Sequence, residues 1–194
     1  MGKQISQIEV LVNRSISAGP AAPGAAPRAA PTDPNPLMMQ PIPANKRDYR
    51  VITNTKRENL FWQLSTQIRS EWWFSSKESS DAYVILPMLG IDYRMKLSNT
   101  NSAPAGKYAF KVKFGMPNGV ETSPIAKHQF KISWNHGESW KSVTPTHCGQ
   151  NACTVEVNNR AGRAASLYVK ATDNQGRAVA QKIVDAYNVR AATN

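Results

Sequence analysis

Long apolar runs are missing from this sequence of 194 residues. No stretch approaches the roughly 18–20 apolar residues that a membrane-spanning helix needs, so we expect no membrane span. The first apolar patch, within residues 5–12, is short and includes Gln7 and Glu9. A secretory signal has a longer uncharged apolar core, so the sequence as given predicts no signal peptide.

Catalytic signatures are also missing. The only histidines are His128, His136 and His147. No pattern around them predicts the arrangement of a Ser–His–Asp enzyme, in which a histidine lies between a carboxylate and a nucleophile. A Gly-x-Ser-x-Gly elbow is absent. The sequence therefore predicts a non-enzymatic protein with no catalytic residue, no cofactor and no metal ion.

Cysteine is scarce, and both cysteines lie close together. Cys148 and Cys153 are separated by residues 149–152, a spacing that favours a small loop-closing disulfide. Two alternatives stay open: a pair of free thiols, and a metal site of both cysteines with His147 and His136. Structural zinc usually has a second ligand pair elsewhere in the chain, and none is evident. A disulfide would indicate an oxidising compartment or a particle released from cells.

Acidic residues are few. The chain has 24 Lys and Arg against 13 Asp and Glu, a net charge of +11, which favours an anionic partner. Eight basic residues fall on the outward phase of expected strands: Arg69, Arg94, Lys96, Lys107, Lys111, Lys113, Lys131 and Lys170. Such cations either prevent edge-to-edge strand pairing or dock on an acidic protein surface. On the outward phase, no aromatic residue interleaves with Lys107, Lys111 and Lys113, so nucleic acid is not expected as a specific partner.

The first 45 residues differ in composition from the rest. Residues 1–17 hold an apolar patch, an anchor candidate formed by Ile5, Ile8, Val10, Leu11 and Val12, which fits a strand or a short helix. Residues 18–45 contain eight of the 13 prolines. Proline fixes φ and removes a backbone donor, so this segment predicts an extended arm. It is either a disordered linker or an arm that lies across a neighbouring subunit.

Residues 46–190 are expected to form one β domain, followed by a tail at 191–194. Alternation of apolar and polar residues recurs, for example at 107–114, where Tyr108, Phe110, Val112 and Phe114 alternate with lysines and an alanine. Turn sequences such as Asn118-Gly119 separate these stretches. The pattern predicts an all-β, immunoglobulin-like antiparallel sandwich.

Tryptophans fall on both phases of the expected strands. Trp72 and Trp134 have the inward phase, and Trp73 and Trp140 the outward phase. Packing in the core or at an interface is the simplest role for the four residues. An exposed pair at 73 and 140 could instead stack on sugar rings or seal a subunit interface.

One resemblance covers residues 49–189. Its motifs are Ser-Glu-Trp-Trp-Phe-Ser-Ser at 70–76, Leu-Pro-Met-Leu-Gly-Ile-Asp-Tyr at 86–93, Asn-Ser-Ala-Pro-Ala-Gly at 101–106, Ile-Ser-Trp-Asn-His-Gly-Glu-Ser-Trp at 132–140 and Leu-Tyr-Val-Lys-Ala-Thr-Asp-Asn-Gln-Gly at 167–176. They resemble the C-terminal β-sandwich domain of secreted, actinobacterial-type subtilisin-like serine proteases. The protease motifs of that family are absent, so no catalytic residue carries over. The resemblance implies an accessory module.

Two functions follow as expectations. The first is a structural or assembly protein, such as a decoration or minor protein of a virion or other extracellular particle, tied to neighbouring subunits by its arm. A homo-oligomer is one form of such an assembly. The second is a secreted accessory domain of a serine protease that binds a wall polymer or its parent enzyme.

Overall fold

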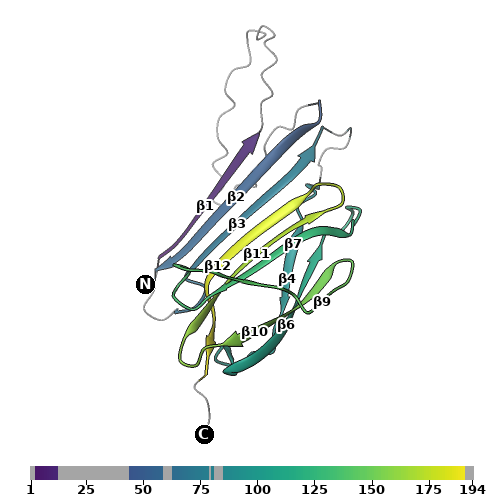
Figure 1. The fold of residues 1–194 in the computed structure, drawn as a ribbon. Coiled ribbons are helices and arrows are strands. Elements are labelled where there is room, and N and C mark those ends of the chain that lie inside the picture. Colours follow the sequence, from purple (N-terminus) through teal and green to yellow (C-terminus); the bar gives the residue numbers. More distant parts are fainter. Residues whose placement is uncertain (1–2, 13–43, 59–62, 79, 81–84, 191–194) are drawn as a thin grey trace.

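Figure 1 shows the fold in a computed structural model, which describes residues 3–12, 44–58, 63–78, 80 and 85–190. The described residues form strands and connections, with no helix among them. The strands are β1 (Lys3–Val12), β2 (Arg47–Glu58), β3 (Gln67–Ser76), β4 (Gly90–Arg94), β5 (Ser102–Ala103), β6 (Gly106–Gly115), β7 (Ile125–Ser133), β8 (Lys141–Val143), β9 (His147–Cys148), β10 (Ala152–Asn159), β11 (Ala164–Asp173) and β12 (Ala178–Val189).

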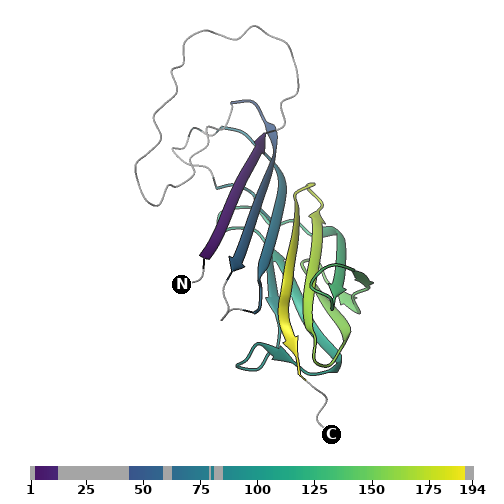
Figure 2. The same cartoon turned by 90° about the vertical axis from the view of Figure 1, so that its left-hand side faces the viewer.

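The strands form two packed sheets. The larger sheet has the order β1-β2-β3-β12-β11-β7-β8, and β5 pairs with β12 off this path. The smaller sheet has the order β4-β6-β10-β9. All pairs on these two paths are antiparallel, whereas β5 runs parallel to β12. Figure 2 follows the large sheet from β1 through β2 and β3 to β12 and β11. The predicted β-sandwich is thereby confirmed.

Strand β6 illustrates why these sequences form strands. Tyr108, Phe110, Val112 and Phe114 are each at most 6% exposed, while the residues between them are exposed. Successive side chains of a strand point to opposite faces, so one face of β6 is apolar and the other polar. The apolar face covers the main core, as the alternation predicts.

The main core lies between the two sheets. Its most enclosed members include Ile132 on β7, Val155 on β10 and Tyr187 on β12. The Tyr187 hydroxyl donates to Oδ1 of Asn159 at 2.9 Å, and Nδ2 of Asn159 donates to the Pro104 carbonyl at 3.0 Å. Burial raises the pKa of Tyr187. These hydrogen bonds satisfy polar groups that would otherwise destabilise the core.

A second, smaller core lies under β2 and β3, which continue past the start of β12 at Ala178. Tyr49, Val51 and Phe74 form it, and Leu86 and Met88 pack against it from the connection to β4. The Tyr49 and Phe74 rings are stacked with centroids 5.6 Å apart. The described residues 85–89 of this connection form no strand and include Pro87, which has no amide hydrogen to donate to a sheet.

The N-terminal patch is a strand. Each residue of β1 pairs with β2 of the same chain, from Lys3 opposite Glu58 to Val12 opposite Tyr49, and β1 forms the edge of the large sheet. The strand alternative for residues 1–17 is therefore correct for 3–12. Most of the proline-rich segment, 18–43, lies outside the described residues. The predicted domain start at residue 46 falls one residue before β2.

Candidate functional site

On the outer face of the large sheet, charged and aromatic side chains gather in three neighbouring rows. Each row consists of residues that lie opposite one another on adjacent strands. The pairing places Arg50, Trp73, Ala178, Thr172 and Lys127 in one row, Ile52, Glu71, Ala180, Lys170 and Gln129 in the next, and Asn54, Arg69, Lys182, Tyr168 and Lys131 in the third. We call Arg50, Arg69, Trp73, Lys127, Lys131, Tyr168, Lys170 and Lys182 the cationic–aromatic face. The two alanines are buried among these longer side chains.

Trp73 is flanked by two cations. The guanidinium carbon of Arg50 lies 5.5 Å from the centre of the Trp73 ring, and Nζ of Lys170 lies 5.3 Å from it. Arg50 comes from β2 and Lys170 from β11, two strands on either side of β3. The electron-rich face of an indole attracts cations, so these contacts hold positive charge beside an aromatic surface.

Tyr168 repeats this arrangement on β11. Nζ of Lys131 lies 5.6 Å from its ring centre, and the Trp140 ring packs edge-on at 6.2 Å. Partial burial, and then the negative charge of Glu71, raise the pKa of the Tyr168 hydroxyl. The hydroxyl therefore stays neutral at physiological pH.

Glu71 is the one acid of these rows on β2, β3, β12, β11 and β7, and the register continues the second row to Glu9 on β1, opposite Ile52. Nε of Arg69 donates to its Oε1 at 2.7 Å, and Arg50 donates to its Oε2. Partial burial raises the pKa of Glu71, but the hydrogen bonds and charges of the two arginines outweigh it and hold the pKa below its ordinary value. Lys127, Lys131, Lys170 and Lys182 form no ion pair with a carboxylate in the described part of the chain. They keep positive charge available to a partner.

The outer face of the small sheet is the second basic surface. We call Arg94, Lys107, Lys111 and Lys113 the lysine face. Two of these cations contact acids on the same surface: Arg94 bonds Asp92 at 2.7 Å, and Nζ of Lys107 lies 3.2 Å from Glu156. No Phe, Trp or Tyr lies in its outward rows on β4, β6, β9 and β10.

The structure divides the eight predicted basic residues between these surfaces. Arg69, Lys131 and Lys170 belong to the cationic–aromatic face, and Arg94, Lys107, Lys111 and Lys113 form the lysine face, while Lys96 is exposed just after β4. The prediction missed Arg50, Lys127 and Lys182. Their outward phase was available in the sequence, but it gave no indication that Arg50 lies beside Trp73 and Lys182 opposite Tyr168.

A cavity of about 720 Å³ opens beside the cationic–aromatic face. It lies where β2 and β3 continue past the turn between β11 and β12, and Arg50, Trp73 and Arg177 are among its lining residues. Nε of Arg177 donates to Oδ2 of the fully buried Asp173 at 2.6 Å. Nη2 of Arg177 and the Tyr49 hydroxyl are buried without a hydrogen-bond partner among the described residues. We call this cavity the notch; three basic residues, one acid and three aromatic residues line it, namely Lys46, Arg50, Arg177, Asp48, Tyr49, Trp73 and Phe74.

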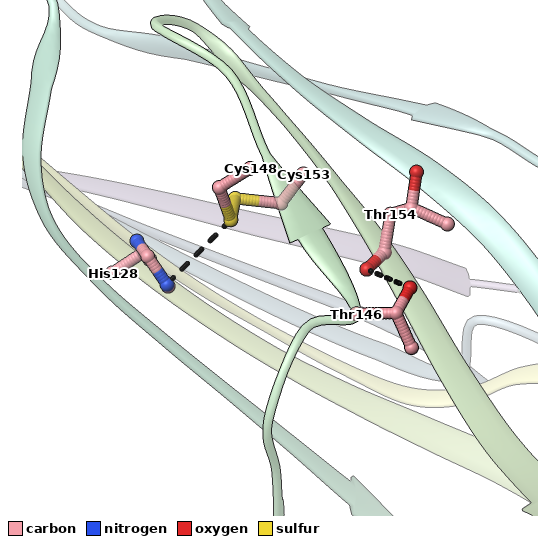
Figure 3. The surroundings of a disulfide bond; sticks show 5 residues. All are labelled: His128, Thr146, Cys148, Cys153 and Thr154. Atoms are coloured by element: carbon pink, nitrogen blue, oxygen red, sulfur yellow. Dashed lines mark hydrogen bonds between the residues drawn. A yellow bond between two sulfur atoms is a disulfide. The ribbon is translucent and has the colours of Figure 1, made fainter.

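The predicted disulfide is present. Cys148 and Cys153 are joined at an S–S distance of 2.05 Å and face each other across β9 and β10 (Figure 3). Alternation with Phe130 and Ile132 predicts that His128 points inward and is buried, and this prediction is wrong for burial. Its phase matches the buried Phe130, but it lies at the open margin between the sheets and is exposed, with Nε2 3.7 Å from Sγ of Cys148.

His136 has a partner that the sequence did not reveal. Its Nδ1 lies 2.9 Å from Oδ2 of Asp185, whose side chain is 9% exposed. The only indication of this contact in the sequence was that Asp185 lies within the apolar stretch 183–187. Ser166 bonds Asp185 rather than the imidazole, and no described residue bonds Nε2 of His136. The contact joins the turn after β7 to β12, and it lacks the nucleophile of a triad.

Fold and surface together define a β-sandwich with a cationic, aromatic outer face. No family model, curated protein or solved structure matches the chain. The resemblance to the protease-associated domain and the immunoglobulin-like topology therefore stay predictions. No helix long and apolar enough to cross a membrane is present among the described residues.

Proposed function

We propose that this chain is a non-enzymatic structural protein that docks on an acidic protein surface through the cationic–aromatic face. The observation that supports this most is the charge on β2, β3, β12, β11 and β7, where Glu71 bonds two arginines and four lysines have no carboxylate partner among the described residues. Complementary charge steers association and selects partners. Such a protein fits a decoration or minor protein of a virion or other extracellular particle.

The N-terminal strand supports a role in assembly. Strand β1 is an edge strand, and residues 13–46 connect it to β2. A strand joined by a long connection can form the same backbone hydrogen bonds with β2 of another copy. Exchange of β1 would tie neighbouring copies together without new contacts, so the anchor residues at 5–12 would act between subunits in the particle.

A second candidate function rests on the aromatic residues. Trp73 and Tyr168 offer rings flanked by cations, and the notch beside Trp73 is lined by Arg50 and Arg177. Aromatic rings stack on sugar rings, and the cations would bind the carboxylates of an acidic polysaccharide. This would suit a secreted accessory domain that binds a wall polymer.

Two polyanions separate these functions. We would measure the affinity of the full chain for poly-L-glutamate and for polygalacturonate over a range of salt concentrations. If the chain docks on acidic protein, it should bind poly-L-glutamate at least as tightly as polygalacturonate. Much tighter binding to polygalacturonate supports the second function, and binding to neither polymer at low salt contradicts both.

Deletion of residues 1–45 tests the assembly role. We expect the shortened chain to stay folded and soluble, because both described cores lie within 46–190, and to lose self-association seen by native mass spectrometry. A shortened chain that assembles like the full chain would contradict the role of the N-terminal segment. Loss of folding would show that the domain boundary is wrong.

A further inference from the structure

The margin where β7 faces the hairpin of β9 and β10 brings three metal-binding side chains together. His128 comes from the large sheet, and Cys148 and Cys153 from the small one (Figure 3). Their donor atoms, the imidazole nitrogen and the two sulfurs, lie within 4.8 Å of one another. In the present state the sulfurs are bonded to each other and cannot act as thiolate ligands.

The distance between the two sheets already suits a metal ion. Nε2 of His128 lies 3.7 Å from Sγ of Cys148. Tetrahedral zinc with Zn–S of about 2.3 Å and Zn–N of about 2.0 Å places neighbouring ligand atoms roughly 3.6 Å apart. The nitrogen of His128 and the sulfur of Cys148 therefore already have the separation of two ligands of one zinc ion. Only the two sulfurs must move apart.

The backbone around the cysteines does not depend on the disulfide alone. The Gly149 amide donates to the Ala152 carbonyl at 2.8 Å, and the Thr146 amide donates to the Thr154 carbonyl at 2.9 Å. These bonds close the hairpin on both sides of the cysteines, so both sulfurs stay near His128 when they are reduced. Cys153 is 3% exposed, whereas Cys148 is partly exposed and His128 is exposed, which leaves an approach for an ion.

We propose that Cys148, Cys153 and His128 form a zinc site once the disulfide is reduced. A dithiol reductant transfers two electrons and two protons to the cystine by thiol–disulfide exchange and becomes a disulfide itself. Zinc then replaces the two thiol protons, neutral His128 supplies Nε2, and a water fills the fourth position. The margin of the sandwich would thus carry a covalent link in oxidising surroundings and a metal link in reducing ones.

The site differs from the metal set that the sequence offered. That set used His147 and His136 beside the cysteines, whereas His136 bonds Asp185 and the described cluster contains neither of the two. His147 is exposed and precedes Cys148 on β9. It is therefore a matched control for His128.

Cobalt(II) titration of the reduced chain tests this proposal. We expect one equivalent to bind with a thiolate-to-cobalt charge-transfer band, zinc to displace it, and zinc to raise the melting temperature of the reduced chain. His128→Ala should weaken affinity at least about tenfold, with His147→Ala close to wild type.

Three results would overturn the proposal. The first is no thiolate band in the reduced wild type. The second is equal loss of affinity in both histidine variants. The third is equal cobalt affinity of the oxidised chain, which would indicate binding by exposed histidines. A melting curve of each variant without metal shows whether it is folded, and both substitutions replace exposed side chains.

Discussion

The two outer faces of the sandwich have similar charge and different construction. On the cationic–aromatic face, cations lie against Trp73 and Tyr168, and Glu71 bonds two arginines. On the lysine face, Arg94 and Lys107 contact acids, and no ring lies among them. The neighbours on adjacent strands therefore distinguish the two faces, because they decide whether a cation lies beside a ring or beside an acid.

The largest difference between the two faces is expected when charges are reversed on each in turn and the affinity for poly-L-glutamate is measured. Lys131→Glu with Lys170→Glu should weaken binding to poly-L-glutamate about tenfold, because each reversed surface charge changes the free energy by roughly 0.5–1 kcal/mol. Lys111→Glu with Lys113→Glu alters the net charge equally on the lysine face. We expect it to weaken binding less than about threefold, measured by salt-dependent titration. Equal losses would mean that net charge alone sets affinity.

Removal of the Trp73 ring should have the next largest effect, a loss of stability. Trp73→Leu removes the contacts with Arg50 and Lys170, each worth about 0.5–1 kcal/mol at an exposed site. The free energy of unfolding, from urea titration, should fall by about 1 kcal/mol. On the lysine face, Ala109→Leu should change it by less than about 0.5 kcal/mol. A Trp73→Leu chain as stable as wild type would show that the cations do not bind the ring in solution.

Glu71 should give a smaller, pH-dependent effect. Its pKa is lowered in the folded state, so its stabilising contribution is fully present above its unfolded pKa near 4.5 and is lost as the pH falls through the folded value. Glu71→Gln should therefore lower stability by less than about 1 kcal/mol at pH 7. The difference from wild type should vanish in acid.

Urea titrations at several pH values measure this difference. A gap between wild type and Glu71→Gln that widens as the pH falls would contradict the lowered pKa.

The ion pair on the lysine face should give the smallest effect. The Lys107 side chain is 78% exposed, and its Nζ lies 3.2 Å from Glu156. Exposed ion pairs contribute little because water and salt screen them. Glu156→Gln should change the free energy of unfolding by less than about 0.5 kcal/mol. A larger loss would mean that the lysine face is also organised by specific contacts.

Local alternation explains why much of the fold could be predicted. The inward residues of β6 and the inward Phe130 and Ile132 of β7 are buried as their phase predicts. The phase of a strand depends on neighbouring residues in the sequence. The same holds for the disulfide of Cys148 and Cys153, whose spacing suits a short hairpin.

Strand pairing explains why the site could not be predicted. Phase tells which residues point outward but not which sheet they belong to, so cations of β6 and β11 were grouped although they lie on opposite faces. Likewise, Trp73 lies between Arg50 and Lys170 only because β2 and β12–β11 pair on either side of β3. Burial also depends on the position of a residue along the sheet. His128 has an inward phase, but it is exposed because it lies at the margin between the sheets.

Amide chemical-shift mapping with poly-L-glutamate tests the central claim most directly. We predict that shifts concentrate on β3, β7 and β11 around Trp73, Tyr168 and Lys170, while the amides of β6 around Lys111 and Lys113 stay unchanged. Shifts that concentrate on β6, or that spread evenly over both faces, would contradict docking through the cationic–aromatic face.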